Sequence, residues 1–286
     1  MSFQFTGFAD EAEKSLFDQV SVLKEVGWDA IELRLIDGKN VCDLTDEEWR
    51  KAWEYLQSEN ISVIGFGGQI GNWACSVDTD FQIDEDELTR VAPRMRECGC
   101  TFLRIMSYPN STESPLTQAD WRHEAARRIR ELAEIAEGEG IILGHENCSG
   151  YGGTKEGFLE LVEEVGHSSF KLIFDTGNNT LHEKSGDATW DYYEACRHEI
   201  VHVHIKAAIA SEGGEFATCF VDEDPIQSRI LSDLQASGYD GWLSIEPHLA
   251  AAIHAGQDID DSGHARKVWV EYAERLEKLV SATAAS

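Results

Sequence analysis

Short apolar segments alternate with longer amphipathic segments along the whole chain of 286 residues. Many of the apolar segments are rich in β-branched residues, and those in the second half turn polar only at their C-terminal ends, as expected for buried parallel strands. We therefore predict eight strands, at residues 3–8, 30–35, 61–66, 101–107, 141–147, 170–178, 200–207 and 241–248.

The segments between these strands are amphipathic, and several of them end in glycine, which is typical of helices. Thr45 is expected to cap the second helix together with Glu48, and Asp261 or Ser262 is expected to cap the last one. Residues 281–286 are expected to fray. The predicted helices lie at residues 11–26, 45–58, 84–98, 118–137, 154–165, 187–196, 225–237 and 264–280.

Eight strands that alternate with eight helices, without a linker, predict an α/β protein that forms a single (β/α)₈ TIM barrel over residues 1–286. An open doubly wound sheet is the alternative, but no glycine-rich nucleotide motif follows the first strand. The loops at residues 67–79 and 108–117 are long. The first is rich in glycine and carries Trp73, which is typical of a binding loop.

The formal net charge of −29 argues against nucleic acid as a partner, because phosphate binding needs clustered lysine and arginine. Surface acid keeps a protein soluble, for example in a high-salt cytoplasm. No apolar run reaches the roughly 18 residues of a membrane span, and the N-terminus lacks the basic region of a signal peptide. The seven cysteines lack zinc-site spacing and are expected to be reduced. These features predict a cytoplasmic protein that does not bind membranes.

Four strands in the second half of the chain end in side chains that bind divalent metals. These side chains are Glu146, Asp175, His204 and Glu246. Since the carboxyl ends of barrel strands meet at one face, the four can converge although they are far apart in sequence. Three carboxylates and one imidazole suit one divalent ion, with Mn²⁺ our first choice and Mg²⁺, Co²⁺ or Zn²⁺ as alternatives.

Each candidate ligand also has a simpler explanation. A strand-end glutamate can pair with a basic residue, as Glu246 could with Lys206, and Asp175 could cap the next helix. His202 and His204 point the same way on a strand, so their spacing alone does not decide which one binds metal. His204 lies nearer the rim and is preferred. The four candidates together, at the ends of consecutive strands, favour a metal site.

Six short motifs follow one another in a characteristic order and spacing: FADE at residues 8–11, GWDAIEL at 27–33, EN at 146–147, DTGN at 175–178, HIK at 204–206 and IEP at 245–247. In these motifs the chain resembles the xylose-isomerase-like barrel superfamily, in the branch of sugar phosphate isomerases and epimerases. The resemblance implies a metal held by Glu146, Asp175, His204 and Glu246, with Glu146 and Glu246 moving the proton, as the two metal-bound glutamates do in ketose 3-epimerases. A metal that polarises a carbonyl beside a carboxylate base suits such chemistry.

The chain departs from the ketose 3-epimerase pattern at three positions. That pattern has histidine, glutamate and arginine where this chain has Asn178, Gly152 and Ala210. His145 offers an alternative chemistry, because the larger subunits of C-glycoside deglycosidases carry a similar His-Glu pair. His145 would then be the base of a lyase that cleaves 3-oxo-glycosides by β-elimination. Otherwise its ring lies between the strand and the helix layer.

We expect a small sugar or glycoside as substrate, and a homo-oligomer or a small accessory subunit as a further partner. The first choice of function is a metal-dependent sugar or keto-sugar isomerase or epimerase, and the lyase is second. An endonuclease IV-like phosphodiesterase shares the fold but is disfavoured by the charge and the few histidines, and a non-catalytic binding subunit by the intact glutamates. The expected substrate contacts are Asn147, Asn178, Lys206, His182, Arg104, Trp73 and His248.

Overall fold

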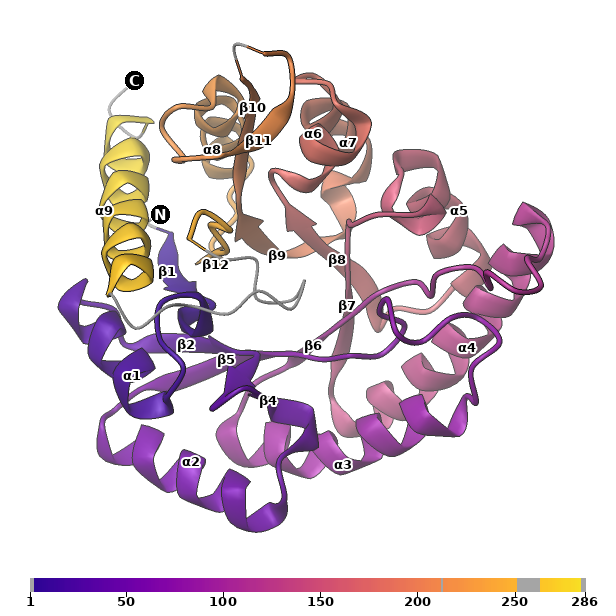
Figure 1. The fold of residues 1–286 in the computed structure, drawn as a ribbon. Coiled ribbons are helices and arrows are strands. Elements are labelled where there is room, and N and C mark those ends of the chain that lie inside the picture. Colours follow the sequence, from indigo (N-terminus) through magenta and orange to yellow (C-terminus); the bar gives the residue numbers. More distant parts are fainter. Residues whose placement is uncertain (1–2, 212, 251–262, 284–286) are drawn as a thin grey trace.

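Eight parallel strands form a nearly closed barrel in the computed structural model, which describes residues 3–211, 213–250 and 263–283 (Figure 1). Their order around the barrel is β1-β12-β9-β8-β7-β6-β5-β2. Between β1 and β2, Thr6 Oγ1 donates a hydrogen bond of 2.9 Å to the Ala30 carbonyl. The predicted (β/α)₈ barrel is therefore confirmed. The strands are β1 (Gln4–Gly7), β2 (Ala30–Leu33), β5 (Ser62–Gly67), β6 (Phe102–Ile105), β7 (Ile142–Glu146), β8 (Phe170–Asp175), β9 (Ile200–Ile205) and β12 (Trp242–Ile245).

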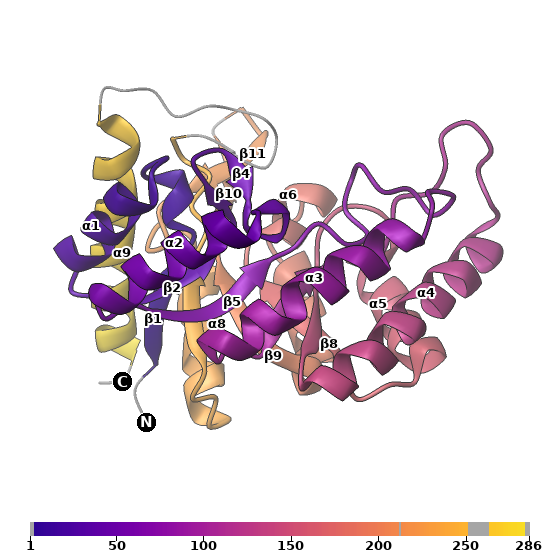
Figure 2. The same ribbon diagram turned by 90° about the horizontal axis from the view of Figure 1, so that it is seen from below.

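Helices cover the outside of the barrel (Figures 1 and 2). The predicted capping box is present, because Thr45 accepts a hydrogen bond from the Glu48 amide while the Glu48 side chain accepts one from the Thr45 amide. The helices are α1 (Leu16–Glu25), α2 (Asp46–Ser58), α3 (Gln82–Cys98), α4 (Gln118–Glu139), α5 (Lys155–Val165), α6 (Asn178–Glu183), α7 (Ala188–Cys196), α8 (Pro225–Ala236) and α9 (His264–Thr283).

Several helix ends differ from the prediction. Helix α1 begins at Leu16, because the Ser15 side chain caps it, and the preceding η1 (Ala9–Glu11) is a short 3₁₀ helix. Helix α9 continues to Thr283, beyond residue 280 where the sequence pattern ends it. The predicted caps Asp261 and Ser262 lie outside the described residues.

Two small hairpins at the top of the barrel escaped prediction. One consists of β3 (Leu35–Ile36) and β4 (Lys39–Asn40), and the other of β10 (Ala207–Ala210) and β11 (Phe216–Cys219). Strand β9 therefore ends at Ile205, and Lys206 lies at the break before β10. Lys206 thus follows the end of the strand, and its side chain is buried.

Side chains alternate along each strand between the barrel interior and the helix layer. The interior is packed across the barrel, with the Phe102 ring 4.4 Å from the ring of His202, centroid to centroid. Gly65 makes room for Phe102, because a Cβ at Gly65 would overlap that ring. This filled layer forms the floor beneath the carboxyl ends of the strands.

Two further expectations concern the cell compartment. All seven cysteines are free. Among the described residues, no helix combines the length and the apolar character that a membrane crossing requires. The cytoplasmic location stays a prediction.

Candidate metal centre and active site

The four predicted ligands come together at the carboxyl ends of four neighbouring strands. Glu146 ends β7, Asp175 ends β8, His204 lies near the end of β9, and Glu246 follows β12. These strands are consecutive in the barrel. All four side chains are buried, and each offers one ligand atom that lies within 4.8 Å of the others. Such a group could hold a metal ion.

The ring of His204 is oriented so that one nitrogen faces this group. Nε2 lies 3.1 Å from Glu32 Oε1, and a carboxylate only accepts, so Nε2 carries the proton. Nδ1 lies 3.5 Å from Glu146 Oε1 and has no hydrogen-bond partner among the described residues. Burial lowers the pKa of His204, but Glu32 and Glu146 raise it to about 10. Without a metal the ring therefore carries a second proton, on Nδ1 beside Glu146, and a metal ion bound at Nδ1 would replace that proton.

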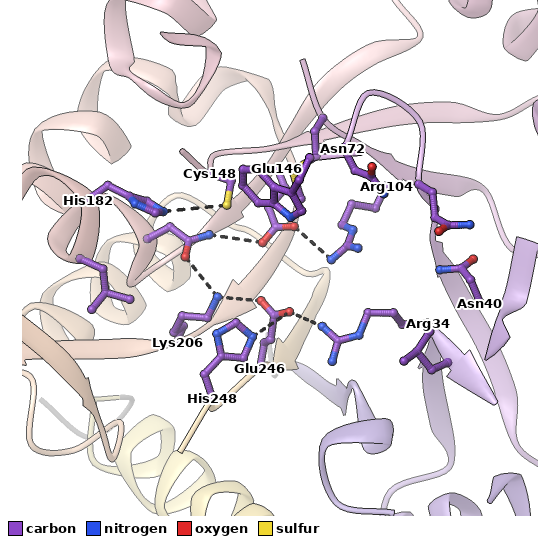
Figure 3. Close-up of a pocket in the computed structure, with 17 residues that line it drawn as sticks. Arg34, Asn40, Asn72, Arg104, Glu146, Cys148, His182, Lys206, Glu246 and His248 are labelled. Carbon is purple, nitrogen blue, oxygen red and sulfur yellow. Dashed lines mark hydrogen bonds and ion pairs between the residues drawn. The ribbon is translucent and has the colours of Figure 1, made fainter. Parts of the chain in front are cut away.

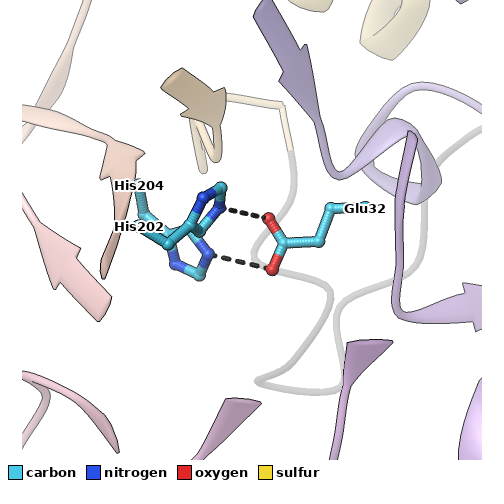
Figure 4. A group of neighbouring side chains, drawn as sticks. All are labelled: Glu32, His202 and His204. Atoms are coloured by element: carbon cyan, nitrogen blue, oxygen red, sulfur yellow. Dashed lines mark hydrogen bonds and ion pairs between the residues drawn. The ribbon is translucent and has the colours of Figure 1, made fainter. Parts of the chain in front are cut away.

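Glu32 holds both histidines of β9 (Figure 4). Its Oε2 accepts hydrogen bonds from His202 Nε2 at 3.0 Å and from Ser244 Oγ at 2.6 Å. Burial raises the pKa of Glu32, yet His204 and His202 lower it well below its ordinary value. Glu32, His202 and His204 are also close enough together to hold a metal. Since the Glu32 oxygens already accept three hydrogen bonds, this group orients His204 instead.

Asp175 divides its two oxygens between two tasks. Oδ1 accepts hydrogen bonds of 2.8 Å from the amides of Gly177 and Asn178, which is the capping role that the sequence offered as an alternative. Oδ2 accepts no hydrogen bond among the described residues, and Lys206 Nζ lies 3.0 Å from it. The carboxylate can therefore stabilise the turn after β8 and still offer one oxygen to a cation.

Lys206 is buried among the candidate ligands. Its Nζ lies 2.8 Å from Glu246 Oε2 and 3.2 Å from Asn178 Oδ1, so the expected pair with Glu246 forms in addition to the contact with Asp175. Burial lowers the pKa of Lys206, but Asp175 and Glu246 raise it above its ordinary value. The amine is therefore a permanent positive charge inside the site.

The buried carboxylates of the site outnumber its cations by one. Burial raises the pKa of Asp175, although Lys206 lowers it, which indicates that the carboxylate charge is only partly compensated. A divalent ion in place of the Nδ1 proton of His204 would bring the charges into balance. The donor set, the orientation of His204 Nδ1 and this excess of acid all fit such an ion. The six buried carboxyl groups of the site are Asp10, Glu11, Glu32, Glu146, Asp175 and Glu246, and its five cations are Arg34, Arg104, Lys206 and, through their raised pKa values, His204 and His248.

A cavity of about 320 Å³ opens at this group, and two of the four candidate ligands, Glu146 and Glu246, line it (Figure 3). The carboxylates of Glu146 and Glu246 point toward each other in this view, and Lys206 lies beside Glu246. Arg104 Nη1 lies 3.2 Å from Glu146 Oε2, and Arg34 Nη1 lies 2.5 Å from Glu246 Oε1. Each glutamate thus has a guanidinium partner on the cavity wall.

The profile of the xylose isomerase-like TIM barrel family matches residues 20–279 of this chain. The chain belongs to that family. An uncharacterized protein of Methanocaldococcus jannaschii is 27% identical over 161 residues, which are 54% of this chain and 50% of that protein. This chain therefore spans about half the length of the curated relative that it matches.

Solved structures of similar fold cover nearly the whole chain. A xylose isomerase-like barrel from Mycobacterium smegmatis, in complex with magnesium, has a TM-score of 0.70 and 16% identity over 99% of this chain and 97% of that one. A probable 3-DHS dehydratase from Bacillus anthracis has a TM-score of 0.71 and 17% identity, over 97% of this chain and 99% of the dehydratase. D-Psicose 3-epimerase from Clostridium cellulolyticum, solved with D-tagatose, has a TM-score of 0.68 and 14% identity, over 97% of this chain and 99% of the epimerase. At these identities the likeness shows the fold.

Most predicted substrate contacts of this xylose isomerase-like barrel line the cavity. His248 Nε2 lies 3.2 Å from Glu11 Oε1 and 3.3 Å from Glu246 Oε1. Trp73 is 43% exposed at the rim. His182 is exposed, with Nε2 4.0 Å from Cys148 Sγ. The predicted contacts that line the cavity are Trp73, Arg104, Asn178, His182, Lys206 and His248.

Two residues that the sequence predicted to act in the site, Asn147 and His145, do not line this cavity. Asn147 turns sideways, where its Oδ1 accepts from the Asp175 amide at 2.6 Å and its Nδ2 donates to Asn179 Oδ1 at 2.7 Å. The His145 ring packs between the strands and the helices, 5.4 Å from the Phe158 ring and 5.9 Å from the Phe170 ring, centroid to centroid. This is the placement that strand alternation offered as the alternative to a catalytic His145.

Arg34 is a site residue that the sequence reasoning missed. Besides Glu246, it contacts Asp10 Oδ2 through Nε at 2.8 Å and Glu11 Oε1 through Nη2 at 3.2 Å. Its guanidinium carbon lies 4.3 Å from the centroid of the Phe8 ring. The signal was present, because Glu32 and Arg34 occupy alternate positions of an apolar barrel strand, which places both inside.

Proposed function

We propose that this chain is a divalent-metal-dependent isomerase or epimerase that acts on a sugar or keto-sugar and moves a proton next to a carbonyl group. The observation that carries the proposal is the convergence of Glu146, Asp175, His204 and Glu246, of which Glu146 and Glu246 line the cavity. A metal ion held there would polarise a substrate carbonyl and stabilise negative charge on its oxygen.

Glu146 and Glu246 are the proposed proton carriers. They face each other across the cavity, so one can remove a proton from one side of a bound carbon and the other can return it to the opposite side. Burial and Glu246 raise the pKa of Glu146, but Arg104 and His204 lower it to about 2. Burial raises the pKa of Glu246, but Lys206, His248 and Arg34 lower it well below its ordinary value, so both glutamates are charged at neutral pH.

Lys206, Asn178 and His248 are proposed to bind substrate oxygens. Lys206 and Asn178 hydrogen-bond to each other at 3.2 Å beside the proposed bases and line the same cavity. Burial lowers the pKa of His248, but Glu11 and Glu246 raise it to about 9, which makes this side chain a donor to a hydroxyl at neutral pH. Three donors around two carboxylates suit a polyhydroxylated substrate.

The lyase is the second candidate, since elimination from a 3-oxo-glycoside starts with the same kind of proton removal. What favours it is a further cavity beside Glu146, which offers space for a leaving substituent. Because His145 packs against Phe158 and Phe170, the base for elimination would be Glu146 or Glu246. Structural neighbours that include a sugar epimerase and a probable dehydratase support either reaction.

Proton exchange in D₂O tests the proposal. Magnesium-loaded protein is incubated with ketoses and 3-oxo-glycosides, and NMR follows deuterium at each carbon. We expect deuterium at one carbon of one substrate, and loss of that exchange in Glu146→Gln. Product analysis then separates an isomer or epimer from an eliminated fragment. If bound metal is demonstrated but no substrate exchanges, the proposed reaction is wrong.

A further inference from the structure

A second cavity of about 350 Å³ adjoins the one above the metal ligands. The two cavities share four lining residues, Trp73, Met106, Glu146 and Cys148. A single ligand can therefore reach from one cavity into the other, passing directly beside Glu146.

Three aromatic residues that line this second cavity use their polar groups inside the protein. Trp121 Nε1 donates to the Tyr108 carbonyl at 2.9 Å, and the Tyr108 hydroxyl donates to Asp84 Oδ2 at 2.8 Å. The Tyr151 hydroxyl donates to Glu160 Oε2 at 2.8 Å. With these groups paired inside the protein, the three rings present carbon surfaces to a ligand.

The walls also form a fixed shape. The rings of Trp121 and Tyr151 meet edge to face, with centroids 5.8 Å apart. Trp121 and Tyr108 are 4% and 3% exposed, so neither ring is free to turn away. Such a preformed apolar slot favours a flat, rigid group.

The charges of the two cavities differ. Arg34, Arg104 and Lys206 line the first cavity, whereas the described residues that line the second include neither lysine nor arginine. Asn110, at its edge, uses both ends of its amide on the backbone of Leu116, at 2.9 and 3.0 Å. A phosphate would therefore find no lysine or arginine here, and the polar side chains that line the cavity are the uncharged Ser107, Asn110, Gln118 and Ser149 together with His145 and Glu146.

We infer that the second cavity binds an aromatic substituent of the substrate while the sugar or keto-sugar part occupies the first. The inference rests on the proposed function, because the metal site defines which end of the substrate reacts. It narrows the substrate class to sugars that carry an aryl group next to the reacting carbons.

Binding of para-fluorophenol, followed by fluorine NMR on the magnesium-loaded protein, tests the inference. We expect saturable binding with a Kd of about 1 mM, an ordinary value for so small a ligand. Replacing Mg²⁺ by Mn²⁺ should broaden the signal of the bound probe, because the cavity borders Glu146. Ser149→Trp places a ring in the cavity and should weaken binding about tenfold or more. Ser114→Trp, on an exposed loop outside the cavity, should leave it unchanged.

Three results would overturn the inference: no saturable binding to the wild-type protein, equal affinity in Ser149→Trp, or no extra broadening with Mn²⁺ bound. The test does not depend on turnover. Absence of deuterium exchange with normal binding of the probe would contradict the proposed reaction and leave the aromatic site standing. Deuterium exchange without binding of the probe would contradict the aromatic site and leave the proposed reaction standing.

Discussion

His204 and Glu32 are joined by a hydrogen bond of 3.1 Å that fixes which ring nitrogen faces the metal ligands. Because Nε2 donates to Glu32, Nδ1 is left toward Glu146. A buried carboxylate behind a metal-binding imidazole both orients the ring and increases its basicity. The metal centre therefore depends on a residue of β2, which lies outside the four strands that carry the ligands.

Glu32→Gln should weaken metal binding by about tenfold to a hundredfold, because an amide offers only one acceptor to two histidines. Calorimetric titration with Mn²⁺ measures the effect. Ser244→Ala is the matched control, since it removes one hydrogen bond to Glu32 and leaves the bond to His204 in place. Equal metal affinity in Glu32→Gln and wild type would show that Glu32 has no part in the site.

Lys206→Met should destabilise the metal-free protein by about 3 kcal/mol or more, because it leaves the buried Asp175 and Glu246 without their shared cation. Added Mg²⁺ should restore most of that stability. Urea denaturation with EDTA and with Mg²⁺ measures both effects.

The control for that variant is Lys171→Met, which breaks a partly exposed ion pair with Glu199 and should cost less than about 1 kcal/mol with or without metal. If Lys206→Met is as stable as Lys171→Met in EDTA, the buried carboxylates do not depend on the lysine.

His145→Leu should keep metal binding and retain the deuterium exchange within about threefold, because the ring packs among apolar side chains and a leucine fills similar space at a cost below about 1.5 kcal/mol. Exchange rates and a metal titration on the same preparation check this. A loss of exchange comparable with that of Glu146→Gln, with metal still bound, would make His145 the base after all.

Glu87 gives the fold a pH dependence. Burial raises its pKa from the ordinary 4.5 to about 7, although hydrogen bonds from the Gln69 amide and Cys42 lower it. The folded state thus holds this proton more tightly than the unfolded state. The resulting stabilisation is complete below pH 4.5 and is lost as the pH rises through 7.

Glu87→Gln should remove this pH dependence, because glutamine does not ionise. As the pH rises from 5 to 8, the free energy of unfolding of the variant should therefore increase by up to about 3 kcal/mol relative to that of the wild type. In the wild type, the Gln69 backbone amide donates a hydrogen bond of 2.8 Å to Glu87 Oε1. The side-chain oxygen of the substituted glutamine can still accept this hydrogen bond. Denaturant unfolding at the two pH values measures the difference. Asp86→Asn, an exposed neighbour on α3, should show no such change. A parallel decline in wild type and Glu87→Gln would disprove the assignment.

The barrel and the meeting of the four ligand candidates could be predicted from sequence because both follow from periodicity. Apolar runs give the strands, and the last polar residue of each run marks one common face. Alternation on a strand also placed His145 and Glu146 on opposite sides, and His202 and His204 on the same side.

Contacts between residues on distant strands of the barrel could not be predicted from the sequence. The pairing of Arg34 with Glu246 joins β2 to the end of β12, and no local pattern links positions so far apart. Asn147 follows a ligand and looks like a substrate contact, yet its amide binds the backbone at Asp175. The hairpin of β10 and β11 forms by antiparallel pairing, and its strands are too short to give a recognisable sequence pattern.

Pulsed EPR of protein loaded with Mn²⁺ tests the central claim most directly, because it counts the nitrogen atoms bound to the metal. We predict one Mn²⁺ per chain with a single imidazole nitrogen, that of His204, which should disappear in His204→Gln. Two nitrogen ligands would place the metal instead at Glu32, His202 and His204. Absence of bound Mn²⁺ would contradict the metal centre altogether.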